Sequence, residues 1–207
     1  MSLFKKFIKN TSNPSNTLAG RLMLSGMNYG HQKMALWCID NYIKLSGSED
    51  VLDIGCGGGR NIANFLKRTN GKVCGIDYSA ASVSKSLKKN KKAVLEKRSL
   101  IVQANVSAIP FEDETFDLIT AFETTYFWES IINDFMEIKR VLKPNGKFVV
   151  CNESSKMEGN ERWTNILDMN IYTAEEIVDT MHQAGFIDIK TYRKDKTQHI
   201  CVIGIKG

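Results

Sequence analysis

Short apolar runs alternate with amphipathic stretches along most of the chain. Runs rich in β-branched and aromatic residues predict strands, at residues 51–55, 72–77, 99–105, 116–122 and 147–152. Apolar residues three and four positions apart predict helices between them, at residues 60–68, 84–98 and 131–142. A longer helical stretch, 20–45, precedes the first strand and is interrupted near Gly26–Gly30. The turn "KPNG" leads from the helix at 131–142 to the strand at 147–152.

The C-terminal part predicts a helix followed by a hairpin. In "TAEEIVDTMHQAG", Thr173 caps the helix, Glu176 occupies its third position and Gly185 ends it. The runs 187–193 and 198–207 flank the polar turn "KDKT" and predict two antiparallel strands. Strands that alternate with helices are typical of an α/β fold with a doubly wound, mostly parallel sheet. The hairpin adds an antiparallel strand at or near one edge.

Length and composition fit one globular domain. The 207 residues are 43% hydrophobic and 25% charged, and no apolar run approaches the roughly 18–20 residues that span a bilayer. Much of the net charge of +5 lies in 84–98, as a solvated lysine face without interleaved aromatic residues, which argues against nucleic acid. The N-terminus "MSLFKKFIKN" predicts a short amphipathic helix docked on the domain, with attachment to a membrane surface as the alternative.

The cysteines and histidines predict neither disulfides nor a metal site. Five cysteines are scattered without a CxxC pair, at positions 38, 56, 74, 151 and 201. They are interpreted as small buried hydrophobic residues in a reducing compartment, so a cytoplasmic protein is expected. The three histidines lie far apart, so no metal is expected.

A glycine-rich loop follows the first strand in "VLDIGCGGGRN", residues 51–61. Such glycines let the backbone approach a nucleotide closely, but a dinucleotide fingerprint needs a third glycine where Arg60 stands. Asp53 would also repel a pyrophosphate, by about 3 kcal/mol for two unit charges about 5 Å apart. S-adenosylmethionine carries a sulfonium and an ammonium instead, which a carboxylate attracts. A purely structural role for Asp53, holding the loop's amides, is the alternative.

Asp77 ends the second strand in "GIDYS", roughly 20 residues beyond the loop. A carboxylate at this position can accept hydrogen bonds from both hydroxyls of a ribose. This feature indicates adenosine, and fits a nicotinamide dinucleotide as well as S-adenosylmethionine.

The chain resembles class I S-adenosylmethionine-dependent methyltransferases. "VLDIGCGGGR" and "GIDYS" are similar to the first two motifs of that family, and "QANVSAIPFEDETFDLITAFET" and "RVLKPNGKFVV" to its third, fourth and fifth strands. The resemblance covers about residues 51–150 and is greatest to the small-molecule branch that includes ubiquinone and menaquinone methyltransferases. It implies a Rossmann-like fold with a seven-stranded sheet, S-adenosylmethionine as donor and S-adenosylhomocysteine as product.

The resemblance also assigns donor-binding roles. Asp53, Gly55 and Gly57 would line the methionine part, with Cys56 between them, and Asp77 would hold the ribose. Further contacts are expected from the residues that border the adenosine or the transferred methyl: Tyr78, Ser79, Asn105, Val106, Phe122 and Glu123. Asn105 stands where the family usually has an aspartate facing the adenine amino group; an amide oxygen can accept the same hydrogen bond.

The acceptor side is less sharply defined. Methyl transfer needs alignment more than a fixed triad, so His31, Glu123 and Tyr126 are only candidate catalytic residues. Tyr29, Tyr126 and Trp128 are candidates for the acceptor pocket, although packing under the following helix would also explain Trp128. We expect one domain with four parts: an N-terminal helical lid at 1–48, a donor-binding core at 49–152, a substrate-side insertion at 153–172 and a C-terminal helix and hairpin at 173–207.

These observations predict a methyltransferase that acts on a small-molecule acceptor, as a monomer or homodimer. Three alternatives stay open. An oxidoreductase would bind NAD in the same loop, a non-catalytic module would bind the donor without transfer, and an RNA methyltransferase would use the lysines of 84–98.

Overall fold

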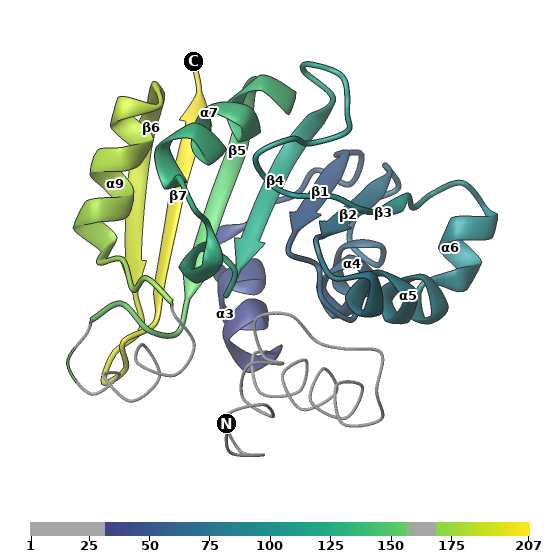
Figure 1. Ribbon diagram of the computed structural model, residues 1–207, viewed down its shortest axis with the longest axis horizontal. Coiled ribbons are helices and arrows are strands. Elements are labelled where there is room, and N and C mark those ends of the chain that lie inside the picture. Colours follow the sequence, from purple (N-terminus) through teal and green to yellow (C-terminus); the bar gives the residue numbers. More distant parts are fainter. Residues whose placement is uncertain (1–31, 157, 159–168) are drawn as a thin grey trace.

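The computed structural model describes residues 32–156, 158 and 169–207, which form a seven-stranded sheet with helices on both faces (Figure 1). The strands are β1 (Val51–Ile54), β2 (Val73–Asp77), β3 (Ile101–Gln103), β4 (Phe116–Phe122), β5 (Leu142–Asn152), β6 (Phe186–Arg193) and β7 (Ile200–Lys206). The helices are α3 (Gln32–Tyr42), α4 (Arg60–Phe65), α5 (Ala80–Lys89), α6 (Lys91–Leu95), α7 (Ile131–Val141) and α9 (Ala174–Gln183), with a short 3-10 turn, η1 (Thr125–Phe127).

The sheet has the order β3-β2-β1-β4-β5-β7-β6. Strands β3, β2, β1, β4 and β5 pair in parallel, and β7 is antiparallel to both β5 and β6. The predicted α/β class, parallel sheet and C-terminal hairpin are confirmed. The antiparallel strand β7 lies one place in from the edge, because the hairpin inserts it between β5 and β6.

Two apolar layers hold the helices against the sheet. On one face, α7 and α9 contribute Phe135, Ile138 and Ile177 to a core that includes Leu52 and Ile54 of β1. On the other face, α3, α4 and α5 pack on the alternate residues of the central strands, such as Val51, in a second core. Because successive side chains of a strand point to opposite faces, Asp53 shares the face of Val51 and points to the α3 and α4 side.

The predicted helix at 84–98 is wrong in one respect, because the structure has two helices there. Asn90 separates α5 from α6. Its buried side-chain amide donates to the backbone oxygens of Gly59 and Ser86, at 3.1 Å each. A polar group that is buried needs such partners, so Asn90 is held to the glycine loop and the helix axis changes there.

The predicted turn "KPNG" is also modified, because it lies inside β5. The pairing of β5 with β4 shifts register between Phe116 and Leu118, and Asn145 takes a positive φ of 62°. The segment therefore forms an irregularity within the strand, with asparagine at the position that favours it.

The C-terminal helix begins as predicted. The Thr173 hydroxyl accepts a hydrogen bond from the backbone of Glu176, whose carboxylate accepts one from the backbone of Thr173. Gly185 has a φ of 81° just after the helix ends. The hairpin that follows leaves β6 as the outer strand.

The predicted burial of the cysteines is confirmed, since all five are buried with free thiols. Among the described residues, no helix has the length and apolarity to cross a membrane. The N-terminal amphipathic helix, the break near Gly26–Gly30, Tyr29, His31 and most of the insertion at 153–172 lie outside the described residues.

Candidate active site

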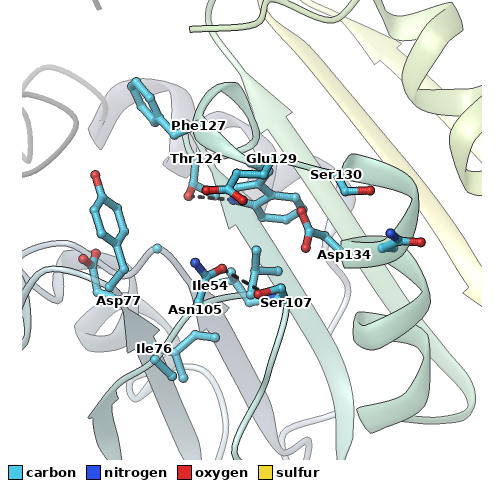
Figure 2. Close-up of a pocket in the computed structure, with 16 residues that line it drawn as sticks. Ile54, Ile76, Asp77, Asn105, Ser107, Thr124, Phe127, Glu129, Ser130 and Asp134 are labelled. Carbon is cyan, nitrogen blue, oxygen red and sulfur yellow. Dashed lines mark hydrogen bonds between the residues drawn. The ribbon is translucent and has the colours of Figure 1, made fainter. Parts of the chain in front are cut away.

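A cavity of about 460 Å³ opens at the carboxyl ends of the central parallel strands (Figure 2). This is where ligands bind in open α/β sheets. Its walls come from the loops after β1, β2, β3 and β4 and from the first turn of α7: Ile54, Gly55, Ile76, Asp77, Tyr78, Ala104, Asn105, Val106, Ser107, Thr124, Phe127, Trp128, Glu129, Ser130, Asn133 and Asp134. Three of these residues are acidic and none is Lys or Arg.

Asp77 ties the second strand to the glycine loop. Its carboxylate accepts hydrogen bonds from the backbone N–H of Gly57 at 2.8 Å and of Ser79 at 2.9 Å. Burial raises the pKa of Asp77, and these backbone hydrogen bonds partly offset the rise. The Ser82 side chain also donates to the Asp77 carboxylate, and because a carboxylate has about four acceptor positions, one remains for a hydroxyl in the cavity.

Two glycines of the loop, Gly55 and Gly57, differ in the space around them. A Cβ on Gly55 would lie 2.3 Å from Oγ1 of Thr124, whereas a Cβ on Gly57 would meet nothing within 4 Å. Both glycines have positive φ, 66° and 51°. Gly55 is therefore required by packing inside the protein, and the space beside Gly57 is available to a ligand.

We expect Gly57→Ala to lower the free energy of unfolding by about 1–2 kcal/mol, the cost of a left-handed Cβ-bearing residue. The added methyl also enters the open space, so a ligand that lies over the loop should bind more weakly to the variant than to the wild type. Chemical unfolding and calorimetric titration with S-adenosylhomocysteine measure the two effects. Unchanged affinity would place the ligand away from the loop.

Asp53 is buried, and only one of its two carboxylate oxygens has a hydrogen-bond partner among the described residues. Its Oδ1 accepts a hydrogen bond from the Thr120 hydroxyl at 2.9 Å, and its Oδ2 has no partner among the described residues. Burial raises the pKa of Asp53 to about 7, and the negative charge of Asp77 adds to the effect. Asp53 does not line the cavity. An unpaired buried carboxylate at the end of β1 fits a cationic ligand group such as an ammonium, because that group would supply the missing donor and charge.

The loop after β3 forms one side of the cavity. Asn105 and Val106, the two residues that the resemblance assigns to the adenine, line it. The side-chain oxygen of Asn105 accepts a hydrogen bond from the backbone N–H of Ser107 at 3.2 Å. This bond holds the loop in a turn and takes up part of the acceptor capacity of Asn105.

The end of β4 carries an unusual backbone conformation. Glu123 has a φ of 59°, a region that non-glycine residues rarely adopt and that is often found at functional sites. Its carboxylate accepts hydrogen bonds from the backbone N–H of Glu153 and from the Tyr126 hydroxyl. These contacts fix the position of Glu123 between the ends of β4 and β5.

Tyr126 is buried, and its hydroxyl is shared between two strand ends. The hydroxyl accepts from the backbone N–H of Ser154 at 3.0 Å and has two acceptors within reach, Glu123 at 3.2 Å and the oxygen of Ser154 at 3.1 Å. Burial raises the pKa of Tyr126 well above its ordinary value, so the phenol stays protonated at neutral pH. Tyr126 can therefore donate a hydrogen bond and position Glu123, but it is not available as a phenolate base.

We expect Tyr126→Phe to lower the free energy of unfolding by about 1–2 kcal/mol, because the partly buried Ser154 N–H loses the hydroxyl as an acceptor and the hydroxyl's bond to Glu123 is lost. Urea unfolding at pH 7 measures the change. Thr125→Val tests the neighbouring buried hydroxyl, which accepts a hydrogen bond from the Asn152 amide at 3.0 Å. A Tyr126→Phe variant as stable as the wild type would show that these bonds contribute no net stability.

Trp128 combines cavity lining with packing under the helix that follows, and its predicted contact with the acceptor stays a prediction. It lines the cavity with Phe127, and its Nε1–H donates to Oγ1 of Thr124 at 3.3 Å. Its ring also packs edge-on against Phe135 of α7, with centroids 6.0 Å apart. The aromatic wall is thus fixed by the core beneath it.

The structure brings together part of the predicted site. Six predicted residues line the cavity: Gly55, Asp77, Tyr78, Asn105, Val106 and Trp128. The others that are described lie behind or beside its walls: Asp53, Cys56, Gly57, Ser79, Phe122, Glu123 and Tyr126. Ser79 caps α5, accepting a hydrogen bond from Ser82, and Phe122 is buried against Phe65. Their predicted contacts with the donor stay predictions.

Sequence reasoning missed the acidic end of the cavity, formed by Glu129 and Asp134 with Ser130 and Asn133. One signal was available for Asp134. It precedes Ile138 by four positions and Val141 by seven, so a carboxylate stands on the apolar stripe of α7.

Comparison with known proteins agrees with this geometry. The family described as "Methyltransferase domain" matches residues 52–150. The 24-methylenesterol C-methyltransferase 2 of Arabidopsis thaliana is 28% identical over 173 residues, which cover 77% of this chain and 46% of the relative. The sterol methyltransferase-like 3 of Botryococcus braunii is 30% identical over 138 residues, 65% of this chain and 35% of the relative. The chain thus spans less than half the length of these relatives.

Solved structures show the same fold. The methyltransferase in the complex with the Haloferax volcanii Trm112 methyltransferase activator has a TM-score of 0.77 at 18% identity, covering 100% of this chain and 98% of that one. Geranyl diphosphate C-methyltransferase of Streptomyces coelicolor A3(2), in a complex containing S-adenosyl-L-homocysteine, has a TM-score of 0.71 at 16% identity, covering 85% and 76%. Residues 52–150, which hold the glycine loop, Asp77 and nearly all of the five parallel strands, match the methyltransferase domain family, and the chain belongs to the class I S-adenosylmethionine-dependent methyltransferases.

Proposed function

We propose that the chain transfers a methyl group from S-adenosylmethionine to a small-molecule acceptor and releases S-adenosylhomocysteine. The observation that carries this proposal is Asp77, which lines a cavity whose described walls contain no Lys or Arg and which holds the glycine loop, where Gly57 borders open space. A ribose diol matches the carboxylate of Asp77, and a close-lying amino acid chain matches the open space beside Gly57. The absence of Lys and Arg from the described lining disfavours a donor that carries phosphates.

Different residues of the site would bind different parts of S-adenosylmethionine. Asp77 would accept a hydrogen bond from a ribose hydroxyl, and Asn105 and Val106 would contact the base. Asp53 would pair with the ammonium of the methionine part. Bound S-adenosylmethionine supplies a methyl group that is already activated by the sulfonium. The protein then has to orient the acceptor and exclude water, and such alignment is worth several kcal/mol.

Aromatic and apolar walls favour an acceptor with substantial apolar surface. Phe127 and Trp128 line the cavity, and the relatives named above are methyltransferases of sterols and of geranyl diphosphate. We include the quinone branch among the possible acceptor classes. The lid at 1–48, with Tyr29 and His31, and the insertion at 153–172 are proposed to complete the acceptor side.

Five buried free thiols favour a reducing compartment, so we propose a cytoplasmic enzyme. Light scattering after size-exclusion chromatography would distinguish a monomer from a homodimer.

Calorimetric titration of the full chain with S-adenosylhomocysteine, with NAD as the comparison, tests the donor site. Transfer of a radioactive methyl group from S-adenosylmethionine to sterol, prenyl diphosphate and quinol acceptors tests the reaction. Binding of S-adenosylhomocysteine with no transfer to any acceptor would favour a non-catalytic module. Tight NAD binding would favour an oxidoreductase, and salt-sensitive RNA binding would favour an RNA methyltransferase.

A further inference from the structure

Asp134 is a buried carboxylate that the proposed reaction does not use. It lies in the first turns of α7 and is 2% exposed. Its Oδ2 has no hydrogen-bond partner among the residues that the structure describes, although the group lines the cavity. Burial raises the pKa of Asp134 to about 6, and a hydrogen bond from the Ser130 backbone partly offsets this. A buried acceptor without a donor is costly, so a ligand that supplies a donor would be favoured here.

The position of Asp134 relative to Asp77 limits what that donor can be. Figure 2 shows Asp77 and Asp134 on opposite sides of the cavity, with Ile54, Asn105 and Ser107 between them. The glycine loop lies at the Asp77 end, because Asp77 accepts a hydrogen bond from the backbone N–H of Gly57 at 2.8 Å. If the ribose is held at Asp77 and the methionine part lies over the glycine loop, the base extends from the ribose toward Asp134.

The chemistry of the cavity lining fits a flat heteroaromatic ring. Ile54, Ile76 and Val106 are among the residues that line the cavity, and all three are apolar. The exocyclic amino group of adenine has two N–H donors. Asn105 could accept from one of them, but its oxygen already accepts from Ser107 at 3.2 Å. Asp134 has an acceptor with no such competitor in the described residues.

We propose that Asp134 is a specificity-determining residue of the donor site, whose carboxylate accepts a hydrogen bond from the exocyclic amino group of adenine. The proposal rests on the proposed function, because it takes the position of the ribose from the S-adenosylmethionine site. It makes recognition of the base depend on α7 as well as on the loop after β3. A base with an oxygen in place of the amino group would meet a second acceptor instead of a donor and would be rejected.

The test compares two ligands that differ only at this group. S-adenosylhomocysteine has the amino group, and S-inosylhomocysteine has an oxygen there. Wild-type full chain is expected to bind the adenosyl ligand at least 10-fold more tightly in calorimetric titration at pH 7.5. Asp134→Asn should weaken binding of the adenosyl ligand about 10-fold or more, the loss of one charged hydrogen-bond acceptor. The same substitution should not weaken binding of the inosyl ligand, because the asparagine amide can donate a hydrogen bond to its oxygen. The preference of the variant for the adenosyl over the inosyl ligand should therefore be smaller than that of the wild type.

Glu129→Gln is the matched control, because it removes a neighbouring negative charge from the exposed rim of the same cavity. It should change the affinities for both ligands by a similar factor. Equal losses for both ligands in Asp134→Asn, or an unchanged preference, would overturn the proposal, and so would a wild type that binds both ligands equally. Asp134→Ser is the second variant if the asparagine variant does not fold. A wild type that binds neither ligand would instead refute the proposed function.

Discussion

Asp77→Ala should weaken the binding of S-adenosylhomocysteine by about 1–3 kcal/mol, or roughly 5- to 150-fold in Kd. The carboxylate is the proposed acceptor for a ribose hydroxyl. It also holds the glycine loop, since it accepts the backbone N–H groups of Gly57 and Ser79. Its removal takes away both the ligand contact and the anchor of the loop. Calorimetric titration of the variant and the wild type at the same pH and salt concentration measures the loss.

The two contributions can be separated with Asp77→Asn. This variant keeps one oxygen acceptor and the volume of the side chain but loses the charge, so we expect an intermediate loss of affinity. S-(2′-deoxyadenosyl)homocysteine gives the complementary comparison. It should bind wild type more weakly than the parent ligand, and Asp77→Ala should discriminate less between the two. An affinity that is unchanged in Asp77→Ala would mean that the ribose lies elsewhere.

The motifs predicted the fold because each of them depends on residues that are close in the sequence. The alternation of apolar strands and amphipathic helices fixes the layers, and the capping box at Thr173 and Glu176 fixes the start of α9. The glycine loop was recognisable because the backbone there takes positive φ, which side chains disfavour.

What the sequence did not predict depends on contacts between distant segments. Asn90 ends α5 because it binds the oxygen of Gly59, a contact across 31 positions that periodicity cannot reveal. The acidic end of the cavity combines the loop after β4 with the first turns of α7, and only the folded chain brings these residues opposite Asp77. The hydroxyl of the buried Tyr126 likewise bonds to the backbone of Ser154, 28 positions away, and the predicted role of Tyr126 at the acceptor or in catalysis stays a prediction.

Asp53 shows a conflict between stability and the proposed function. A carboxylate with only one described hydrogen-bond partner, 1% exposed at the end of β1, destabilises the ligand-free protein whenever it is ionised. Hydrophobic or amide side chains of similar volume would avoid that cost. We infer that the carboxylate is favoured by its use in binding the cationic part of the donor, which would supply the opposite charge that the protein lacks there.

The pH dependence of stability tests this inference. The pKa of Asp53 is about 7 in the folded protein and about 4 in an unfolded chain. Below about pH 4 the group is protonated in both the folded and the unfolded state, so it does not lower the free energy of unfolding. As the pH rises to about 7, the unfolded chain ionises first, so stability falls by about 1.4 kcal/mol per unit. Above pH 7 the loss is constant, on the order of 4 kcal/mol.

Asp53→Asn cannot ionise, so it should lack this loss. In urea unfolding between pH 4 and pH 8, the stability of the variant relative to the wild type is expected to rise by a few kcal/mol, and groups common to both proteins cancel in the difference. Saturating S-adenosylhomocysteine should narrow the gap at pH 8, because its ammonium stabilises the ionised carboxylate only in the wild type. Parallel pH profiles for the two proteins would show that Asp53 is not a strained buried acid. A gap at pH 8 that the ligand leaves unchanged would separate Asp53 from the donor site, leaving it the role of a structural group bonded to Thr120.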